Sequence, residues 1–328
     1  GLVRLLREPQ RGASEGLVAP KHHAPFSVLW TELAAVIPPF TIWSVYRHGA
    51  SVTRNLLAAS LLAVFAWGMI ELTGNLLQWV ALSIAGYVTV SWLQGLSTRD
   101  KASFRMMFHS KALVFTTLAF PTIAFVSYGT SFWTAPFLIR VHGVTASDVG
   151  WYVGIGNAIG GLIGVVMGGM LADRMKLYFV NGRLMIGIVT ILLTAPLILW
   201  MVKTEDLMTA YWLNFAYHIP ASMWVSIAPA TVNDLVMPRM RATAGAWFLL
   251  MNTIIGLALG PYAMGRLSDM FIAGGADSGA ALSQAIAWGQ CIFILTAILL
   301  ALAMRYLPGD EASRLNRART LGESFDQK

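Results

Sequence analysis

The sequence has few charges and almost no cysteine. Only 12% of its 328 residues are charged, which is about half the share of roughly 25% found in soluble proteins. The single cysteine, Cys291, excludes an internal disulfide framework and a thiolate metal cluster. With 56% hydrophobic residues, neither a disordered chain nor a water-soluble globule is expected. The composition therefore indicates a protein that lies in a membrane.

Long apolar runs recur along the chain. A bilayer core about 30 Å thick is crossed by roughly 20 apolar residues in a helix. The sequence lacks the alternation of a β-barrel, so these runs predict an all-α polytopic membrane protein. Eight runs are candidates to cross the membrane: Leu56–Thr73, Leu76–Leu96, Ala112–Ala135, Val149–Leu171, Leu184–Val202, Leu207–Ala230, Ala242–Met264 and Ala285–Met304. Only Gly74 and Asn75 separate the first two runs, which predicts a tight helical hairpin.

The basic residues indicate how the chain is oriented. If the residues before Leu56 are cytoplasmic, eight crossings place 20 of the 23 Lys and Arg on the cytoplasmic side. This bias is the one expected from the positive-inside rule, and it predicts that both ends of the chain are cytoplasmic. The basic residues are scattered over short loops, so a nucleic-acid-binding face is not expected.

One apolar run carries a stripe of small residues. Gly156, Gly160, Gly164 and Gly168 recur every fourth residue, with Gly161 and Gly169 beside them. On a helix this spacing leaves a bare face along which another helix can approach closely. Static packing is the simpler interpretation of each glycine alone, whereas four repeats favour a continuous seam.

The glycine stripe runs directly into an acidic and a basic residue. Asp173 is expected to cap the N-terminus of a neighbouring helix, where the helix dipole favours a negative charge. Arg174 is expected to pair with a carboxylate or with the carbonyl end of a helix. The alternative for both is a pair of charges at the level of the lipid headgroups.

Residues 168–174, Gly-Gly-Met-Leu-Ala-Asp-Arg, resemble a loop motif of the major facilitator superfamily. In the twelve-helix plan of that superfamily, the motif joins the eighth and ninth helices. Three other segments resemble its spinster-like branch: residues 7–12 the exit of the sixth helix, residues 132–143 the seventh-to-eighth passage, and residues 238–244 with Asn252, Gly256, Gly260 and Pro261 the tenth-to-eleventh region. The four segments follow one another in the order of the family.

The resemblance implies a division of the chain. Residues 1–54 are expected to form a cytoplasmic linker with an interfacial helix at Leu29–Trp43, and residues 55–97 an inserted transmembrane hairpin. Residues 98–306 correspond to the carboxy-terminal six-helix bundle of the superfamily, and residues 307–328 to a cytoplasmic tail. The chain is thus interpreted as a carboxy-terminal part, with the amino-terminal six helices of the same protein as its expected partner.

Polar side chains inside the apolar runs are candidates for a binding site, because they are costly in a membrane. The resemblance places them on the seventh, eighth, tenth and eleventh helices of the superfamily, around its central cavity. Hydrogen bonding between helices, or anchoring of aromatic rings at the interface, is the alternative role. The candidates are Tyr211, Asn214, His218, Asn252, Trp247, Asn157, Ser127, Tyr128 and Ser131 for substrate binding, and Gly169, Asp173, Arg174, Arg239 and Arg241 for conformational gating.

The sequence shows no constellation typical of an enzyme. It has no paired carboxylates within an apolar run, no phosphate-binding glycine loop and no His-Glu-x-x-His motif. The pair His22–His23 has no further ligands at a suitable spacing, so a solvated linker is favoured over a metal site. Neither an enzyme nor a cofactor is expected, and an intramembrane enzyme centred on His218 is the least favoured interpretation.

The resemblance implies a secondary transporter that works by alternating access between two helical bundles. Because the expected cavity is aromatic and almost uncharged, a small amphipathic or lipid-like organic solute is the expected substrate, with H⁺ as the coupling ion. The alternative is a membrane scaffold or receptor that keeps the fold without transport. The expected location is the bacterial inner membrane, and the expected partners are the solute and the lipid bilayer.

Overall fold

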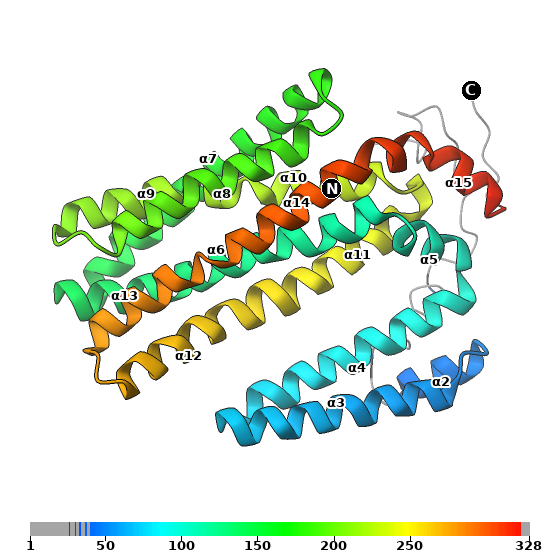
Figure 1. Ribbon diagram of the computed structural model, residues 1–328, viewed down its shortest axis with the longest axis horizontal. Helices are drawn as coiled ribbons and strands as arrows, with labels where there is room; N and C mark the ends of the chain where they lie inside the picture. Colours follow the sequence, from blue (N-terminus) through cyan, green and yellow to red (C-terminus); the bar gives the residue numbers. More distant parts are fainter. Residues whose placement is uncertain (1–25, 27–29, 31–32, 34–36, 38–39, 323–328) are drawn as a thin grey trace. The chain divides into compact units, whose positions relative to one another are not determined.

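The computed structural model describes residues 40–322 together with Phe26, Trp30, Leu33 and Ile37, and every regular element in this part of the chain is helical (Figure 1). The motif at residues 7–12, the pair His22–His23 and most of the expected interfacial helix Leu29–Trp43 lie outside the described residues. The chain divides into two compact units. One comprises residues up to His109, Val236–Thr243 and the residues from Ser313 onward, and the other comprises Ser110–Leu235 and Ala244–Ala312. This division does not test the boundaries predicted at residues 54, 97 and 306, which stay predictions.

The first unit contains the predicted hairpin. Its helices are α2 (Phe40–Arg47), α3 (Val52–Thr73), α4 (Leu76–Arg99), α5 (Lys101–Phe108), the short η3 (Pro238–Met240) and α15 (Arg314–Thr320). Gly74 ends α3 with a φ of 70°, a conformation that glycine adopts without strain, and Asn75 caps α4 by accepting a hydrogen bond from the Gln78 amide. The hairpin turn between these helices is therefore confirmed.

The second unit holds the remaining helices, which lie side by side as a bundle (Figure 1). They are α6 (Lys111–His142), α7 (Ala146–Tyr178), α8 (Gly182–Met201), α9 (Leu207–Ser222), α10 (Trp224–Asp234), α11 (Arg241–Met251), the π-helix η4 (Asn252–Ala258), α12 (Leu259–Ala273), α13 (Ser278–Gly289) and α14 (Ile292–Ala312). Helix α6 is the most buried of the long apolar helices and contacts α14, η4 and α12. It forms the core of the bundle.

Seven segments of the described chain are long and apolar enough to cross a membrane. They correspond to seven of the eight predicted runs. The other run, Leu207–Ala230, is divided into α9 and α10, each of which is shorter than a full crossing. Pro220 and Pro229 supply no amide hydrogen to a helix, and the Met223 amide donates to the Pro220 carbonyl where α9 ends. The interruption lies at Met223, three residues after Pro220, whereas Pro229 lies within α10.

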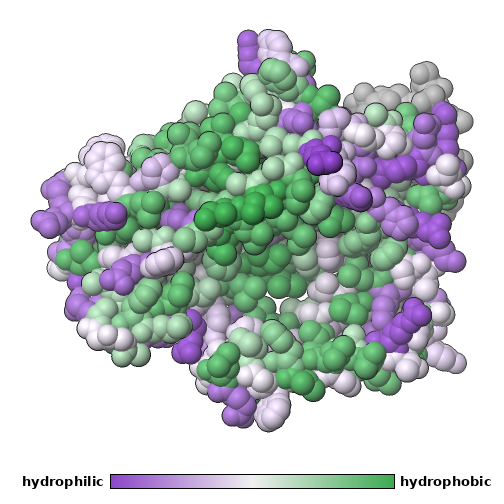
Figure 2. Space-filling view, in the orientation of Figure 1, coloured by the Kyte–Doolittle hydropathy of each residue, from purple (hydrophilic) through white to green (hydrophobic). Residues whose placement is uncertain are grey.

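The surface of the bundle is apolar along the middle of its helices. Ile294, Leu295 and Ile298 are exposed near the middle of the span Ser278–Ala312, which comprises α13 and α14, and Figure 2 shows hydrophobic surface along α14. Exposed apolar side chains at mid-helix are expected where lipid rather than water is the solvent.

The glycine stripe of α7 packs directly against α9 and the start of α10. A methyl group on Gly160 would lie 2.9 Å from the Phe215 carbonyl oxygen, and one on Gly168 would lie 2.7 Å from Cα of Met223. A methyl group on Gly164 would overlap the Ile219 carbonyl oxygen. The two helices approach each other backbone to backbone, so the predicted seam is confirmed.

Candidate solute-binding site

Four of the predicted polar residues form one chain of hydrogen bonds across three helices. Asn157 on α7 donates to the Ser131 hydroxyl on α6 over 3.5 Å, and Asn214 on α9 donates to the Asn157 side-chain oxygen over 3.0 Å. His218, one turn along α9, has its Nδ1 at 2.9 Å from the Asn214 carbonyl oxygen. The sequence placed these residues on facing helices, and the structure brings them into contact as a neutral polar chain.

Two buried polar atoms beside this chain have no hydrogen-bond partner among the described residues. One is the side-chain oxygen of Asn214, whose residue is fully buried, and the other is the hydroxyl of Tyr211, which is 7% exposed. A buried polar atom without a partner costs about 1–3 kcal/mol. A solute that supplied a donor to either oxygen would remove that cost.

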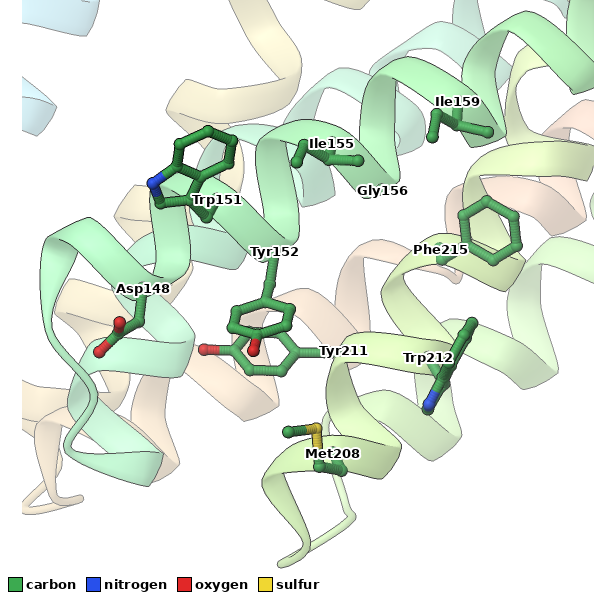
Figure 3. A pocket seen from close by; sticks show the side chains of 10 residues that line it. All are labelled: Asp148, Trp151, Tyr152, Ile155, Gly156, Ile159, Met208, Tyr211, Trp212 and Phe215. Atoms are coloured by element: carbon green, nitrogen blue, oxygen red, sulfur yellow. The ribbon is translucent and has the colours of Figure 1, made fainter.

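A groove of about 780 Å³ lies between α7 and α9, next to the polar chain (Figure 3). The rings of Tyr152 and Tyr211 stack with centroids 4.5 Å apart, and Figure 3 shows the Tyr211 hydroxyl directed toward the side where Asp148 lies. The lining residues are mainly aromatic and aliphatic: Asp148, Trp151, Tyr152, Ile155, Gly156, Ile159, Met208, Tyr211, Trp212 and Phe215. This volume lies within the range of about 300–1,000 Å³ that is usual for small-molecule sites.

Tyr211 is the predicted binding residue that lines the groove itself. Trp151, Tyr152 and Asp148 on α7, and Trp212 and Phe215 on α9, were missed by the sequence analysis. A sequence signal was available, because Trp151, Tyr152, Tyr211 and Trp212 are aromatic pairs at the same ends of two predicted spans. Which ends lie together, however, depends on the packing of the two helices.

Ser127 and Tyr128 on α6 lie where α9 gives way to α10. The Ser127 hydroxyl donates to the Ala221 carbonyl over 3.1 Å, and the Tyr128 ring meets the Trp224 ring edge-on at 6.1 Å between centroids. The Ala221 carbonyl lies beside the break between the two helices, so the Ser127 hydroxyl satisfies backbone there. Neither residue lines the groove, and their predicted role in substrate binding stays a prediction.

Asn252 and Trp247 belong to another part of the bundle. Asn252 begins the π-helix η4, is 8% exposed, and its side-chain oxygen has no partner among the described residues. Trp247 is half-buried on α11, one helical segment earlier. Neither residue lines the α7–α9 groove. π-Helical turns are frequent at functional positions in helices, so Asn252 stays a candidate.

The other end of α7 carries a network of ion pairs. Asp234 on α10 binds both Lys176 on α7 and Arg183 on α8. Lys176 also pairs with Glu311 on α14 at 3.0 Å, and Arg183 pairs with Asp173 at 2.8 Å. These five side chains join α7, α8, α10 and α14 at one end of the bundle.

The structure corrects the expected role of Asp173. Asp173 accepts hydrogen bonds from the Arg183 side chain, 3.1 and 2.8 Å long, instead of capping a helix. A carboxylate that does bind the N-terminus of another helix is Asp310 on α14, which accepts from the Ser110 hydroxyl and the Ala112 amide at 2.8 Å each. Arg174 is exposed and makes no hydrogen bond or ion pair with a residue that the structure describes. Its expected carboxylate partner is therefore not seen.

Two further gating candidates lie in the first unit. Arg239 on η3 donates to both carboxylate oxygens of Asp100, over 2.9 and 3.3 Å, and Arg241 begins α11 two residues later. Burial raises the pKa of Asp100, but hydrogen bonds from Arg239 and Ser103 lower it by more, so this pKa lies below its usual value. Asp100 therefore stays ionised and paired at neutral pH.

Comparison with known proteins identifies relatives of this chain by sequence. No protein-family model matches it. An MFS-type efflux pump of Mycolicibacterium smegmatis is 31% identical over 150 residues, which cover 44% of this chain and 34% of that protein. The human protein spinster homolog 3 is 28% identical over 214 residues, covering 58% of this chain and 42% of that protein.

A solved structure has the same fold. A bacterial homologue of the human lysosomal transporter spinster, in an inward-facing and unoccupied conformation, aligns with a TM-score of 0.51 and 22% identity over 84% of this chain and 68% of that one. The chain thus shares its fold with a spinster homologue, and its sequence relatives are an MFS-type efflux pump and spinster proteins. These relatives agree with the resemblance stated from the sequence.

The relatives indicate the general class of protein and its location in a membrane. The relatives are transporters rather than enzymes, and the seven apolar helices and these relatives together indicate an integral multi-pass membrane protein. The spinster-like chain spans between a third and a half of the length of the curated relatives named above. Within the described residues, no group of three or more His, Cys, Asp or Glu is arranged to hold a metal ion.

Proposed function

We propose that the protein is a secondary transporter that moves a small amphipathic or lipid-like organic solute by alternating access. The observation that carries the proposal is the aromatic groove between α7 and α9, which adjoins the neutral polar chain of Ser131, Asn157, Asn214 and His218. An apolar body would lie against the rings, while a polar group would reach Tyr211, whose hydroxyl has no partner among the described residues.

The remaining parts of the proposal concern the partner, the coupling ion and the location. Alternating access requires a second bundle, so the expected partner of this chain is a six-helix half that corresponds to the amino-terminal part of the superfamily. We propose H⁺ as the coupling ion, carried mainly by residues of that half. The proposed location is the bacterial inner membrane with both ends of the chain in the cytoplasm, in agreement with the bias of Lys and Arg.

The first test measures flux of a fluorescent lysolipid in proteoliposomes that contain the protein. We expect uptake or release to depend on the protein and to respond to an imposed pH gradient, whereas flux of an uncharged sugar stays at the level of empty liposomes. If no solute moves although the protein is folded and correctly inserted, the scaffold or receptor interpretation replaces the transporter.

Variants then test whether the groove is the binding site. Trp212→Ala removes an exposed ring that lines the groove, and we expect about a tenfold rise in the half-saturating concentration of the lysolipid, since burial of a large apolar side chain contributes about 1.5 kcal/mol or more. Trp200→Ala on α8 is the matched control, because Trp200 is similarly exposed and does not line the groove. Equal concentrations for both variants would place the binding site elsewhere.

A further inference from the structure

A second, smaller pocket lies in the first unit, at the junction of α4 and α5. Its volume is about 250 Å³, and it is lined by Ser97 at the end of α4, by Lys101, Phe104 and Arg105 on α5, and by His109 directly after α5. Lys101, Arg105 and His109 follow one another at intervals of four residues, which places them on one face of the helix. The pocket is therefore bounded on one side by a row of nitrogen-bearing side chains.

The positive charge of this pocket is not neutralised by the residues around it. Lys101, Arg105 and His109 are exposed, and their side chains make no hydrogen bond or ion pair with any residue that the structure describes. The neighbouring carboxylate, Asp100, is bound to Arg239 and to Ser103 and does not line the pocket. Like charges one helical turn apart, such as Lys101 and Arg105, repel each other. A bound anion would attract both side chains and so offset this repulsion.

The position of the pocket indicates which anion reaches it. Helix α5 directly follows α4, one of the apolar helices long enough to cross a membrane, and begins after Arg99 and Asp100. It has three buried residues, Ser103, Met106 and Met107, and a pair of neighbouring rings, Phe104 and Phe108, with centroids 4.9 Å apart. A short amphipathic helix at the end of a crossing lies at the depth of the lipid headgroups.

We propose that this pocket binds the phosphate group of an anionic phospholipid. Lys101 and Arg105 supply charge and hydrogen-bond donors, and the His109 ring adds a further polar group on the same side of the pocket. The Phe104 ring provides an apolar wall for the glycerol and the first acyl carbons. Basic pockets beside transmembrane helices are a recurrent form of headgroup site.

The binding test uses the purified protein and measures lipid adducts by native mass spectrometry during titration with phosphatidylglycerol. We expect the double variant K101Q/R105Q to bind this lipid at least fivefold more weakly than the unchanged protein. The double variant R54Q/R174Q is the control, because it also loses two positive charges, from exposed side chains that make no hydrogen bond or ion pair with described residues and do not line the pocket. Equal losses in the two double variants would overturn the proposal, since the effect would then come from net charge alone.

Two further measurements fix the class of ligand. Phosphatidylcholine is expected to bind at least fivefold more weakly than phosphatidylglycerol, and equal binding of the two lipids would overturn the assignment of an anionic headgroup. Inorganic phosphate at millimolar concentration is expected to leave the lipid adduct in place, and displacement of the lipid at that concentration would instead identify a site for free phosphate. The variant K101R/R105K keeps both charges and should bind phosphatidylglycerol within twofold of the unchanged protein, which separates the role of charge from a loss of folding.

Discussion

The two ends of helix α7 carry opposite kinds of chemistry. At one end, Trp151 and Tyr152 contribute to an aromatic groove, whereas at the other end Asp173 and Lys176 enter a network of ion pairs. Between the two ends, the helix has almost no side chains on its buried face, since that face is the glycine stripe. One rigid element therefore connects a surface suited to a solute with a surface suited to hold helices together.

The difference between the ends reflects the cost of charge in a membrane protein. Aromatic rings can remain exposed in a lipid or interfacial environment, but charges need water or a partner. The side chains of Lys176, Arg183, Asp234 and Glu311 are all between 16 and 29% exposed, so each is partly withdrawn from water and is paired. The ion-pair end thus restricts how α7, α8, α10 and α14 move, while the groove end leaves α7 and α9 open to a ligand.

The seam between the two ends gives the largest expected effect. Gly164→Ala would place a methyl group on the Ile219 carbonyl oxygen, so α7 and α9 must separate. Forcing extra volume into a packed interface costs about 1–3 kcal/mol. We expect a clearly lower unfolding temperature in detergent and lower abundance in the membrane.

The same helix provides the control for this change. A methyl group on Gly154 would meet no atom within 4 Å, so Gly154→Ala should leave the unfolding temperature unchanged or slightly higher, because alanine is the better helix former. If the two variants unfold at the same temperature, the close packing at Gly164 does not stabilise the bundle.

The sequence was sufficient to predict seven membrane-length segments and the seam, but not the division of the run Leu207–Ala230 into α9 and α10. Apolar runs of membrane-spanning length and a repeat of Gly156, Gly160, Gly164 and Gly168 are local patterns, so they can be read without knowing the neighbours. The partner of the seam could not be read, because periodicity identifies a face of a helix and not the helix that covers it. That partner, α9 with the start of α10, is known only from the packing.

The ion pairs could not be predicted from local sequence patterns. Lys176 and Asp234 are 58 residues apart, and Lys176 and Glu311 are 135 residues apart. In the sequence, Lys176 and Arg183 counted only as positive charges on the cytoplasmic side, and Asp173 was expected to cap a helix. The correct interpretation needs the folded arrangement, which brings the ends of four helices together.

The second expected effect concerns the shared acid of the network. Asp234→Asn leaves Lys176 and Arg183 without their common charged acceptor, and we expect a loss of about 1–2 kcal/mol of unfolding free energy, since these pairs are only partly buried. Asp173→Asn should cost a few tenths of a kcal/mol at most, because the Asp173 side chain is 66% exposed. Thermal unfolding at low and at high salt measures both losses, and salt should reduce each of them.

An exposed arginine at the same end of α7 is the control for the network. Arg174→Gln removes a charge that makes no hydrogen bond or ion pair with a described residue, so its unfolding temperature should equal that of the unchanged protein. If Asp234→Asn behaves like Arg174→Gln, the ion pairs contribute no stability, and the contrast between the two ends of α7 is one of composition alone.

The smallest expected effect concerns the charge at the groove. Asp148 is the acidic residue among the groove lining, so it should favour solutes with a positive or hydrogen-donating group over anionic ones. A unit charge at about 4 Å contributes about 1 kcal/mol in water, which corresponds to roughly fivefold in affinity. For Asp148→Asn we therefore expect binding of a cationic fluorescent amphiphile to weaken by up to about fivefold, and binding of its sulfonated anionic analogue to strengthen.

Glu205→Gln removes an exposed acid that does not line the groove and should change neither affinity. If both amphiphiles bind the Asp148→Asn protein as they bind the unchanged one, Asp148 does not select the solute, and selection at this end of α7 depends on the rings alone.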